Sequence, residues 1–218
     1  MDLHARVLFC HDPGDRLVCV NEPPYPAAPR WYAGTSRDGR VVRYRTDVPG
    51  DLRAAIAALD VAAAGAAHLA AVASLLATDR PLGAIWIGPA YAFGETPTEG
   101  AGARIIDGDS RSVLLPHYPW VHAELAERAP VVAAVVDGAA VSVCCTARRT
   151  DRAAEASLDT IADYRGRGLA TAVTAVWAAA VRRSGLVAMY STSWDNLASQ
   201  GVARRLGLVP YGWDAHIG

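Results

Sequence analysis

The 218-residue sequence contains no lysine and no excess of either charge. Its 21 basic residues, all arginine, are balanced by 22 acidic ones, which leaves a formal net charge of −1. Without a basic excess, a non-specific nucleic-acid binder is not expected, and no aromatic-and-basic platform for RNA is present. Without lysine, a P-loop for nucleotides is excluded as well.

Cysteine is also scarce. Cys10, Cys19, Cys144 and Cys145 are too few to form a disulfide framework in a chain of this length. The adjacent pair, Cys144 and Cys145, would point to opposite faces of a strand. We therefore expect reduced thiols and a cytoplasmic protein. The first residues lack a basic segment followed by an apolar one, so no signal peptide is expected.

Long uninterrupted apolar runs are missing. The most apolar segment, 52–77, is rich in alanine and is interrupted by Arg53, Asp60 and His68. A membrane span prefers continuous Leu, Ile, Val and Phe. We predict no membrane association and two Ala-rich helices instead, over 50–59 and 64–78.

The sequence supports neither a metal centre nor the active site of a serine hydrolase. His117 and His122 are separated by Pro119, which does not suit two metal ligands on one helix face, so no metal is expected. The G-x-S-x-G turn of serine hydrolases does not occur in the sequence.

The N-terminal half shows two hairpin patterns. Segments 6–10 and 16–20 flank Asp12-Pro-Gly-Asp15, and segments 31–35 and 40–45 flank Arg37-Asp-Gly39. The second pattern carries Arg30, Arg37, Arg43 and Arg45. We interpret these arginines as a solvated strand face, with a basic wall for a phosphate or an acidic substrate as the alternative.

The middle of the chain is rich in loops. Here we predict a short strand at 84–87, an exposed loop at 94–100 and a turn at 116–120 that leads into a short helix at 121–128. Pro130 marks the predicted boundary between an N-terminal α+β region, 1–129, and a second domain, 130–218.

From residue 131 onward the pattern predicts a hairpin followed by alternating helices and strands. The predicted elements are strands 131–136 and 139–146 around Asp137-Gly138, a strand at 153–161, a helix ending near 183, a strand at 186–192, a helix at 195–206 and a strand at 208–216. Gly207 suits a helix C-cap, and Asp195 or Asn196 suits an N-cap. This order predicts an α/β fold with a mixed sheet.

The clearest chemical signal is Arg165-Gly-Arg-Gly168, between a predicted strand and a predicted helix. A helix N-terminus offers unpaired N–H groups and partial positive charge. Glycine lets a phosphate approach the backbone, and arginine suits phosphate oxygens. A dinucleotide site would need glycine at Thr171 and a carboxylate near Ser191-Thr192. We predict a pyrophosphate cradle of another type.

Two motifs in order resemble the GNAT superfamily of acyltransferases. Arg165, Gly168 and Ala170 match its Arg/Gln-x-x-Gly-x-Gly/Ala loop for acetyl-CoA. Asn196 opens the next helix, and Leu206-Gly-Leu208 closes it. The resemblance covers about 130–218 and points to a bacterial subgroup. It implies a GNAT fold with a mixed α+β sheet and an N-terminal α+β extension, for which a degenerate second copy of the fold stays open.

The resemblance implies acetyl-CoA as co-substrate and no metal. Backbone groups of Leu158, Asp159 and Thr160 would hold the pantetheine along strand 153–161. The pyrophosphate would lie on Gly166, Arg167, Gly168, Leu169, Ala170 and Thr171, and Arg165 and Ser199 complete the predicted set. Asn196 would form a hydrogen bond near the thioester.

Transfer to an amine also requires a base and benefits from an acid. Glu155 is the predicted base, with an ion pair to a nearby arginine or a solvent-facing side chain as the alternative. Ala203 stands where many superfamily members have a tyrosine acid. The candidates to replace it are Ser199, Tyr190, Tyr211 and His216.

We therefore predict an N-acetyltransferase that moves an acetyl group directly from acetyl-CoA to a primary amine of a small molecule. A protein N-terminus or lysine as acceptor, or a coenzyme-binding module without turnover, remains as the alternative. A homodimer is an expected state, because dimers are frequent in the superfamily.

Overall fold

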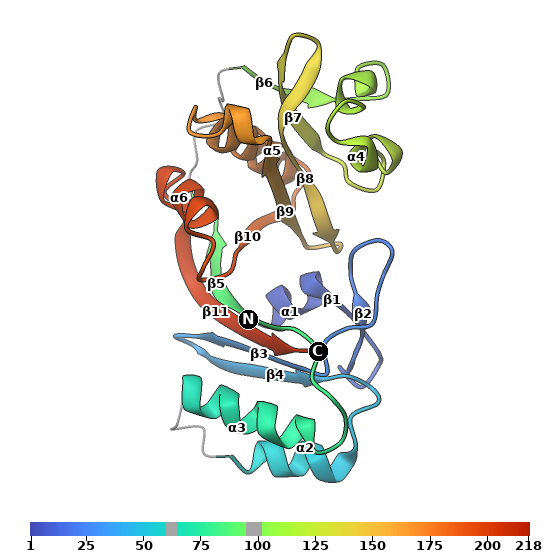
Figure 1. The fold of residues 1–218 in the computed structure, drawn as a ribbon, viewed down its shortest axis with the longest axis vertical. Coiled ribbons are helices and arrows are strands. Elements are labelled where there is room, and N and C mark those ends of the chain that lie inside the picture. The colour runs from blue at the N-terminus through green and yellow to red at the C-terminus, as the bar shows by residue number, and fades with distance from the viewer. Residues whose placement is uncertain (60–64, 95–101) are drawn as a thin grey trace. The chain divides into compact units, whose positions relative to one another are not determined.

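The computed structural model describes residues 1–59, 65–94 and 102–218 (Figure 1). The chain forms two compact units, one of residues 1–88 with 213–218 and one of residues 89–212. Strands β5 (Ile85–Ala92) and β11 (Val209–Ile217) each have residues in both units. The boundary predicted at Pro130 stays a prediction about domains.

Within its described residues, the first unit has three helices, a two-stranded sheet and part of a nine-stranded sheet. Its elements are α1 (Asp2–Leu8), β1 (Phe9–His11), β2 (Leu17–Val20), β3 (Trp31–Ser36), β4 (Gly39–Tyr44), α2 (Gly50–Ala57) and α3 (Ala66–Ala77). β1 pairs with β2, and β4, β3 and β11 follow one another in a second sheet. The helices predicted near 50–59 and 64–78 are confirmed as α2 and α3, and the break between them lies outside the described residues.

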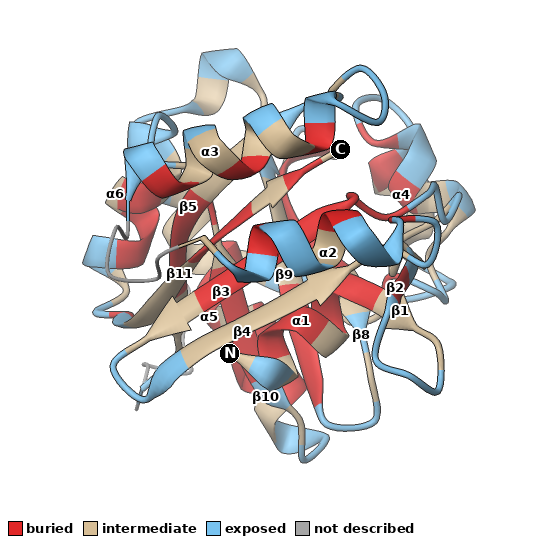
Figure 2. Cartoon of the chain, turned by 90° about the horizontal axis from the view of Figure 1, so that it is seen from below, coloured by how far each residue is buried: buried red, intermediate tan, exposed pale blue. Residues whose placement is uncertain are grey.

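Strand alternation explains how this unit buries both faces of its sheet. Trp31 and Ala33 pack into a core with residues of α2 and α3, while Tyr32 packs into a second core with Ala5 and Leu8 of α1. In Figure 2, α2 and α3 each show a buried stripe and an exposed stripe. None of the helices in the described part of the chain is long and apolar enough to cross a membrane.

Two sequence predictions for this unit were wrong in detail. Residues 6–8 belong to helix α1 and not to a strand, because Ala5, Leu8 and their neighbours form one buried helical face. The predicted strand at 84–87 continues as β5 to Ala92. The hairpin around Arg37-Asp-Gly39 is confirmed as β3 and β4.

The second unit contains a mixed sheet with helices on both faces. Besides the ends of β5 and β11, its elements are β6 (Ala103–Ile106), η1 (Arg111–Leu114), α4 (Pro119–Ala123), β7 (Val131–Val136), β8 (Ala139–Arg149), β9 (Ala153–Thr160), η2 (Ala162–Tyr164), α5 (Leu169–Arg183), β10 (Val187–Ser191) and α6 (Leu197–Arg205). Its strands follow the order β5-β10-β9-β8-β7-β6. Only β9 and β10 run parallel among the neighbouring pairs with a described register.

The elements predicted from residue 131 onward are confirmed with shifts of a few residues. Strand β6 was missed, and the helix predicted at 121–128 instead spans Pro119–Ala123. The loop predicted at 94–100 lies almost entirely outside the described residues.

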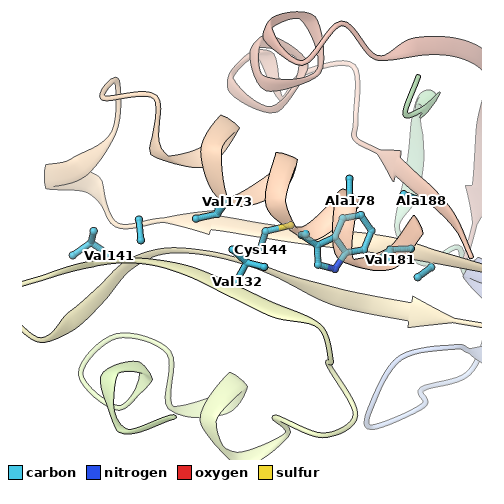
Figure 3. Packing of buried hydrophobic residues seen from close by; sticks show 10 residues of the cluster. Val132, Val141, Cys144, Val173, Ala178, Val181 and Ala188 are labelled. Atoms are coloured by element: carbon cyan, nitrogen blue, oxygen red, sulfur yellow. The ribbon is translucent and has the colours of Figure 1, made fainter. Parts of the chain in front are cut away.

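The core of this unit follows the alternation along β7 and β8. Val132 and Cys144 pack with α5 on one face of the sheet, and Val131 and Cys145 pack with η1 and α4 on the other. The opposite directions predicted for the two cysteines are thereby confirmed. Figure 3 shows the α5 face, where Val173 and other residues of the helix point at the strands.

Candidate coenzyme and catalytic site

Strands β9 and β10 run side by side for only three residue pairs and then separate. Ala153 pairs with Val187, and the last pair joins Glu155 to Met189. Beyond this point β10 continues to pair with β5, while β9 continues to pair with β8 as far as Thr160. Within the described ranges, the β10 side of β9 therefore has no strand partner from residue 156 to residue 160.

The hydrogen bond from Ile161 N–H to Val141 O sets which backbone groups face this open edge. In an antiparallel ladder, the backbone N–H and C=O groups of successive residues point alternately toward the partner strand and away from it. Asp159 therefore directs its peptide groups at β8. Leu158 and Ala156 direct theirs at the open edge, where an extended ligand can add as a strand.

The loop that follows β9 presents backbone amides to solvent. Gly166 and Gly168 have φ angles of 76° and 79°, a region that favours glycine. Gly168 is also the N-cap of the fifteen-residue helix α5. Among the described residues, no acceptor is found for the N–H groups of residues 166–171. A positive helix end with unpaired donors is thus adjacent to the open strand edge.

The two arginines of the loop form hydrogen bonds that hold it, and they also give it positive charge. Arg165 Nε donates to the carbonyl of Thr160 at 3.0 Å, which ties the loop to the end of β9. Arg167 Nη2 donates to the carbonyl of Asp163 at 2.8 Å, and its guanidinium lies 4.7 Å from the ring centre of Tyr164. Both residues are exposed, so their charges remain accessible to an anion.

Glu155 is buried and both of its carboxylate oxygens are engaged. Oε2 accepts a hydrogen bond from Arg148 Nη1 at 2.8 Å, and Oε1 accepts one from the Ser191 hydroxyl. The side chain is 3% exposed. The ion pair that was the alternative to a catalytic role is therefore present, at the apex where β9 and β10 separate.

Asn196 acts as the N-cap of α6, which decides between the two predicted caps. Its Oδ1 accepts a hydrogen bond from Ser199 N–H at 3.0 Å. Gln200 ties the preceding loop to the helix, because its Nε2 donates to the carbonyl of Trp194 at 2.8 Å. These hydrogen bonds connect the loop after β10 to α6.

We expect Asn196→Ala to destabilise the protein by about 1 kcal/mol, because the Ser199 N–H loses its acceptor. Thermal unfolding measures this loss. Asn196→Asp keeps a capping oxygen and serves as control. A role of the Asn196 amide in coenzyme binding would appear as weaker acetyl-CoA affinity in both variants, whereas capping alone would leave the affinity of the aspartate variant unchanged.

Tyr190 is one of the four candidates for the acid that were named from the sequence, and it lies at the centre of this region. It is 2% exposed and packs with Ala203 and Leu208, and with Ala156 and Leu158 of the open edge. Burial raises the pKa of Tyr190 to about 12, while its hydrogen bond with Ser199 acts in the opposite direction. No local pattern in the sequence marks Tyr190, because its position depends on the packing of residues that are far apart in the chain.

Other predicted candidates lie elsewhere. His216 is in the first unit, where its ring stacks on Trp86 at 5.0 Å. The arginines of the first unit form ion pairs with neighbouring acids, as in Arg30 with Asp79 at 2.6 Å and Arg43 with Asp2 at 2.6 Å. These ion pairs disfavour the basic wall. The interpretation of a solvated strand face was wrong for Arg30, which is buried. No cluster of three metal-ligating side chains occurs in the part of the chain that the structure describes.

The second unit is thus an α/β unit with a mixed sheet, and its two parallel strands separate beside a glycine loop at a helix N-terminus. Residues 127–211 match the model of the GNAT acetyltransferase family. The predicted fold class is confirmed, and the match supports the predicted acyltransferase class. Among curated proteins, none matches the sequence.

Solved structures agree with the fold. A GCN5-related N-acetyltransferase-like protein from Streptococcus suis has a TM-score of 0.53 at 16% identity, covering 88% of this chain and 85% of its own. A protein assigned to the GNAT family from Novosphingobium aromaticivorans has a TM-score of 0.52 at 18% identity, covering 63% of this chain and 66% of its own. This chain thus spans just under two thirds of the length of the latter relative.

Proposed function

We propose that the protein is an N-acetyltransferase that moves an acetyl group from acetyl-CoA to a primary amine of a small molecule. The observation that supports this most is the adjacency of an open strand edge and a solvent-facing glycine loop. The edge is suited to the amides of pantetheine, and the loop amides at the start of α5 are suited to pyrophosphate.

The residues of the loop fit the coenzyme in shape and charge. The positive φ angles of Gly166 and Gly168 turn the backbone so that its N–H groups face outward, and the arginines at 165 and 167 add full positive charge. Leu158 and Ala156 would bind the pantetheine through their peptide groups. We propose contacts by Leu169, Ala170 and Thr171 on the same grounds, since their amides belong to the first turn of α5.

Calorimetric titration tests the binding step. We expect acetyl-CoA to bind. Desulfo-CoA should retain most of the affinity, because it keeps the phosphates, which are the only groups of the coenzyme that we propose to contact the loop. No binding at millimolar coenzyme would overturn the proposal. Release of CoA thiol in the presence of spermidine, glucosamine, an aminoglycoside or a peptide with a free N-terminus then identifies the class of acceptor.

A second candidate is a coenzyme-binding module without turnover. The specific observation in its favour is the engagement of both Glu155 oxygens by Arg148 and Ser191, which leaves this carboxylate poorly placed to accept a proton. Tight acetyl-CoA binding with no thiol release above the protein-free rate, across the whole amine panel, would favour this candidate.

We expect Glu155→Gln to lower kcat roughly tenfold or more if the carboxylate accepts the amine proton, directly or through water. Acetyl-CoA affinity should not change, because the side chain does not belong to the phosphate loop. The matched control is Asp159→Asn, an exposed carboxylate on the same strand. Equal turnover of Glu155→Gln and the parent protein would remove Glu155 from the mechanism and leave it as the partner of Arg148.

A further inference from the structure

A pocket of about 310 Å³ lies in the first unit and is bordered by helix α3 and by strands of the sheet. All the residues that line it belong to the first unit, and none of them belongs to the proposed coenzyme site. The volume is in the usual range for a small-molecule pocket. We call it the α3 pocket, and it is lined by Trp31, Arg40, His68, Leu69, Ile87 and Trp213, among others.

Most of the wall of the α3 pocket is apolar and part of it is aromatic. Trp31 of β3 and Trp213 of β11 line it together with Leu69 of α3 and Ile87 of β5, and these four side chains pack in one cluster. Trp31 is buried and Trp213 is half-buried. Indole side chains offer a large and rigid apolar surface, to which a flat aromatic ring is well suited.

Arg40 brings a positive charge into this apolar wall. It pairs in register with Thr35, which lies four residues after Trp31, so strand alternation directs Arg40 and Trp31 to the same face of the sheet. The Arg40 guanidinium lies 5.7 Å from the ring centre of Trp31. Its Nη2 lies 2.9 Å from Nε2 of His68. Because a guanidinium has no acceptor, Arg40 donates in this hydrogen bond, and the His68 proton is on Nδ1.

The charge of Arg40 has no carboxylate partner within residues 1–59, 65–94 and 102–218. Arg30 and Arg43 differ in this respect, since each has an acidic partner at 2.6 Å. The Nε of Arg40 is buried without an acceptor from the described part of the chain. Burial also lowers the pKa of Arg40. A partly buried charge that lacks a counter-charge is unfavourable, so an anion from solution would be stabilised beside it.

We infer that the α3 pocket binds a small aromatic carboxylate, with its ring against Trp31 and Trp213 and its carboxylate on Arg40. The planar guanidinium matches the geometry of a carboxylate. A phosphate dianion fits less well, because its second charge would lie in an apolar wall. The inference goes beyond the proposed function and does not depend on it, since no residue of the pocket takes part in acetyl transfer as proposed above.

Calorimetric titration of the full chain with indole-3-acetate is the first test. We expect saturable binding at one site. Indole-3-acetamide has nearly the same shape without the charge and should bind roughly tenfold more weakly or worse, because a hydrogen bond to a charged group is lost. Cyclohexylacetate keeps the charge without the aromatic ring and should also bind more weakly. The inference is overturned by absent saturation at millimolar indole-3-acetate, or by equal affinity for either analogue and indole-3-acetate.

Arg40→Gln should weaken indole-3-acetate binding to about the level of the acetamide, again roughly tenfold. The matched control is Arg43→Gln, which removes the same charge from β4 at a position on the opposite face, and it should keep the affinity of the parent protein. Equal losses in both variants would indicate a general effect of net charge and would contradict the site. Thermal unfolding shows whether each variant is folded.

Leu69→Trp provides a test that leaves Arg40 in place. The larger side chain fills part of the pocket, so binding of indole-3-acetate should be lost. Binding that is unchanged in Leu69→Trp would show that the ligand lies elsewhere, even if Arg40→Gln did not fold. Failure of the parent protein to bind acetyl-CoA would count against the proposed function alone, and failure to bind indole-3-acetate would count against the α3 pocket alone.

Discussion

Replacing Gly168 by aspartate is expected to weaken acetyl-CoA binding about a hundredfold, or by about 2.7 kcal/mol. The substitution places a carboxylate at the N-cap of α5, beside the amides that we propose to bind pyrophosphate. Two negative charges a few ångströms apart near a protein surface repel by a few kcal/mol. Calorimetric titration of the variant with acetyl-CoA measures the effect, and the repulsion should decrease as salt is added.

Backbone strain must be separated from charge in this experiment. Gly168 has a φ of 79°, so any side chain there is strained, although a Cβ would meet nothing within 4 Å. Asparagine tolerates this conformation about as well as aspartate does and has nearly the same shape. The fold loss of affinity in Gly168→Asn should therefore be less than roughly a tenth of the fold loss in Gly168→Asp. Equal losses in both variants, or no loss in either, would contradict the location of the phosphates at this loop.

Much of the candidate site could be predicted because its signals are local. The Arg165-Gly-Arg-Gly168 loop is a short segment in which glycine positions, charge and the start of a helix coincide, and the structure places them as expected. The cap at Asn196 is local in the same sense. Contacts between distant residues could not be predicted in this way. The hydrogen bonds of Glu155 with Arg148 and Ser191 depend on the register of three strands.

Tyr190 illustrates the same limit. Its importance depends on where β10 leaves β9 and on which side chain faces Ala203, and neither is written in the local sequence around residue 190. The direction of the backbone N–H and C=O groups is a further example. The sequence does not show whether those of Leu158 or those of Asp159 face the open edge, and only the pairing of Ile161 with Val141 decides this.

The errors in the fold have equally specific causes. Val7 and Leu8 are apolar and Val7 is β-branched, which suits a strand, but the buried face that they share with His4 and Ala5 makes them the end of a helix. Tertiary packing overrode local propensity there. Strand β6 is four residues long and pairs with β7 at the edge of the sheet, and so short a segment carries no readable periodicity.

Replacing Trp177 by alanine is expected to destabilise the second unit by about 4 kcal/mol, the usual cost of truncating a buried tryptophan. Trp177 is fully buried between α5 and the sheet, and its Nε1 donates to Thr146 Oγ1 at 3.2 Å. Truncation removes the hydrogen bond and leaves a cavity under the helix whose first turn belongs to the proposed phosphate site. For a protein of this size, the melting temperature should fall by roughly 10 °C.

Two controls show which part of this loss comes from packing. Trp177→Phe keeps most of the ring, and Thr146 keeps its hydrogen bond to the carbonyl of Ala129, so we expect a loss of about 1.5 kcal/mol. Trp194→Ala makes the same chemical change at a side chain that is half exposed and should cost less than about 0.5 kcal/mol. A loss in Trp177→Ala as small as that in Trp194→Ala would mean that α5 is not held on the sheet by this core. The phosphate loop would then lack the rigid support that a preformed anion site requires.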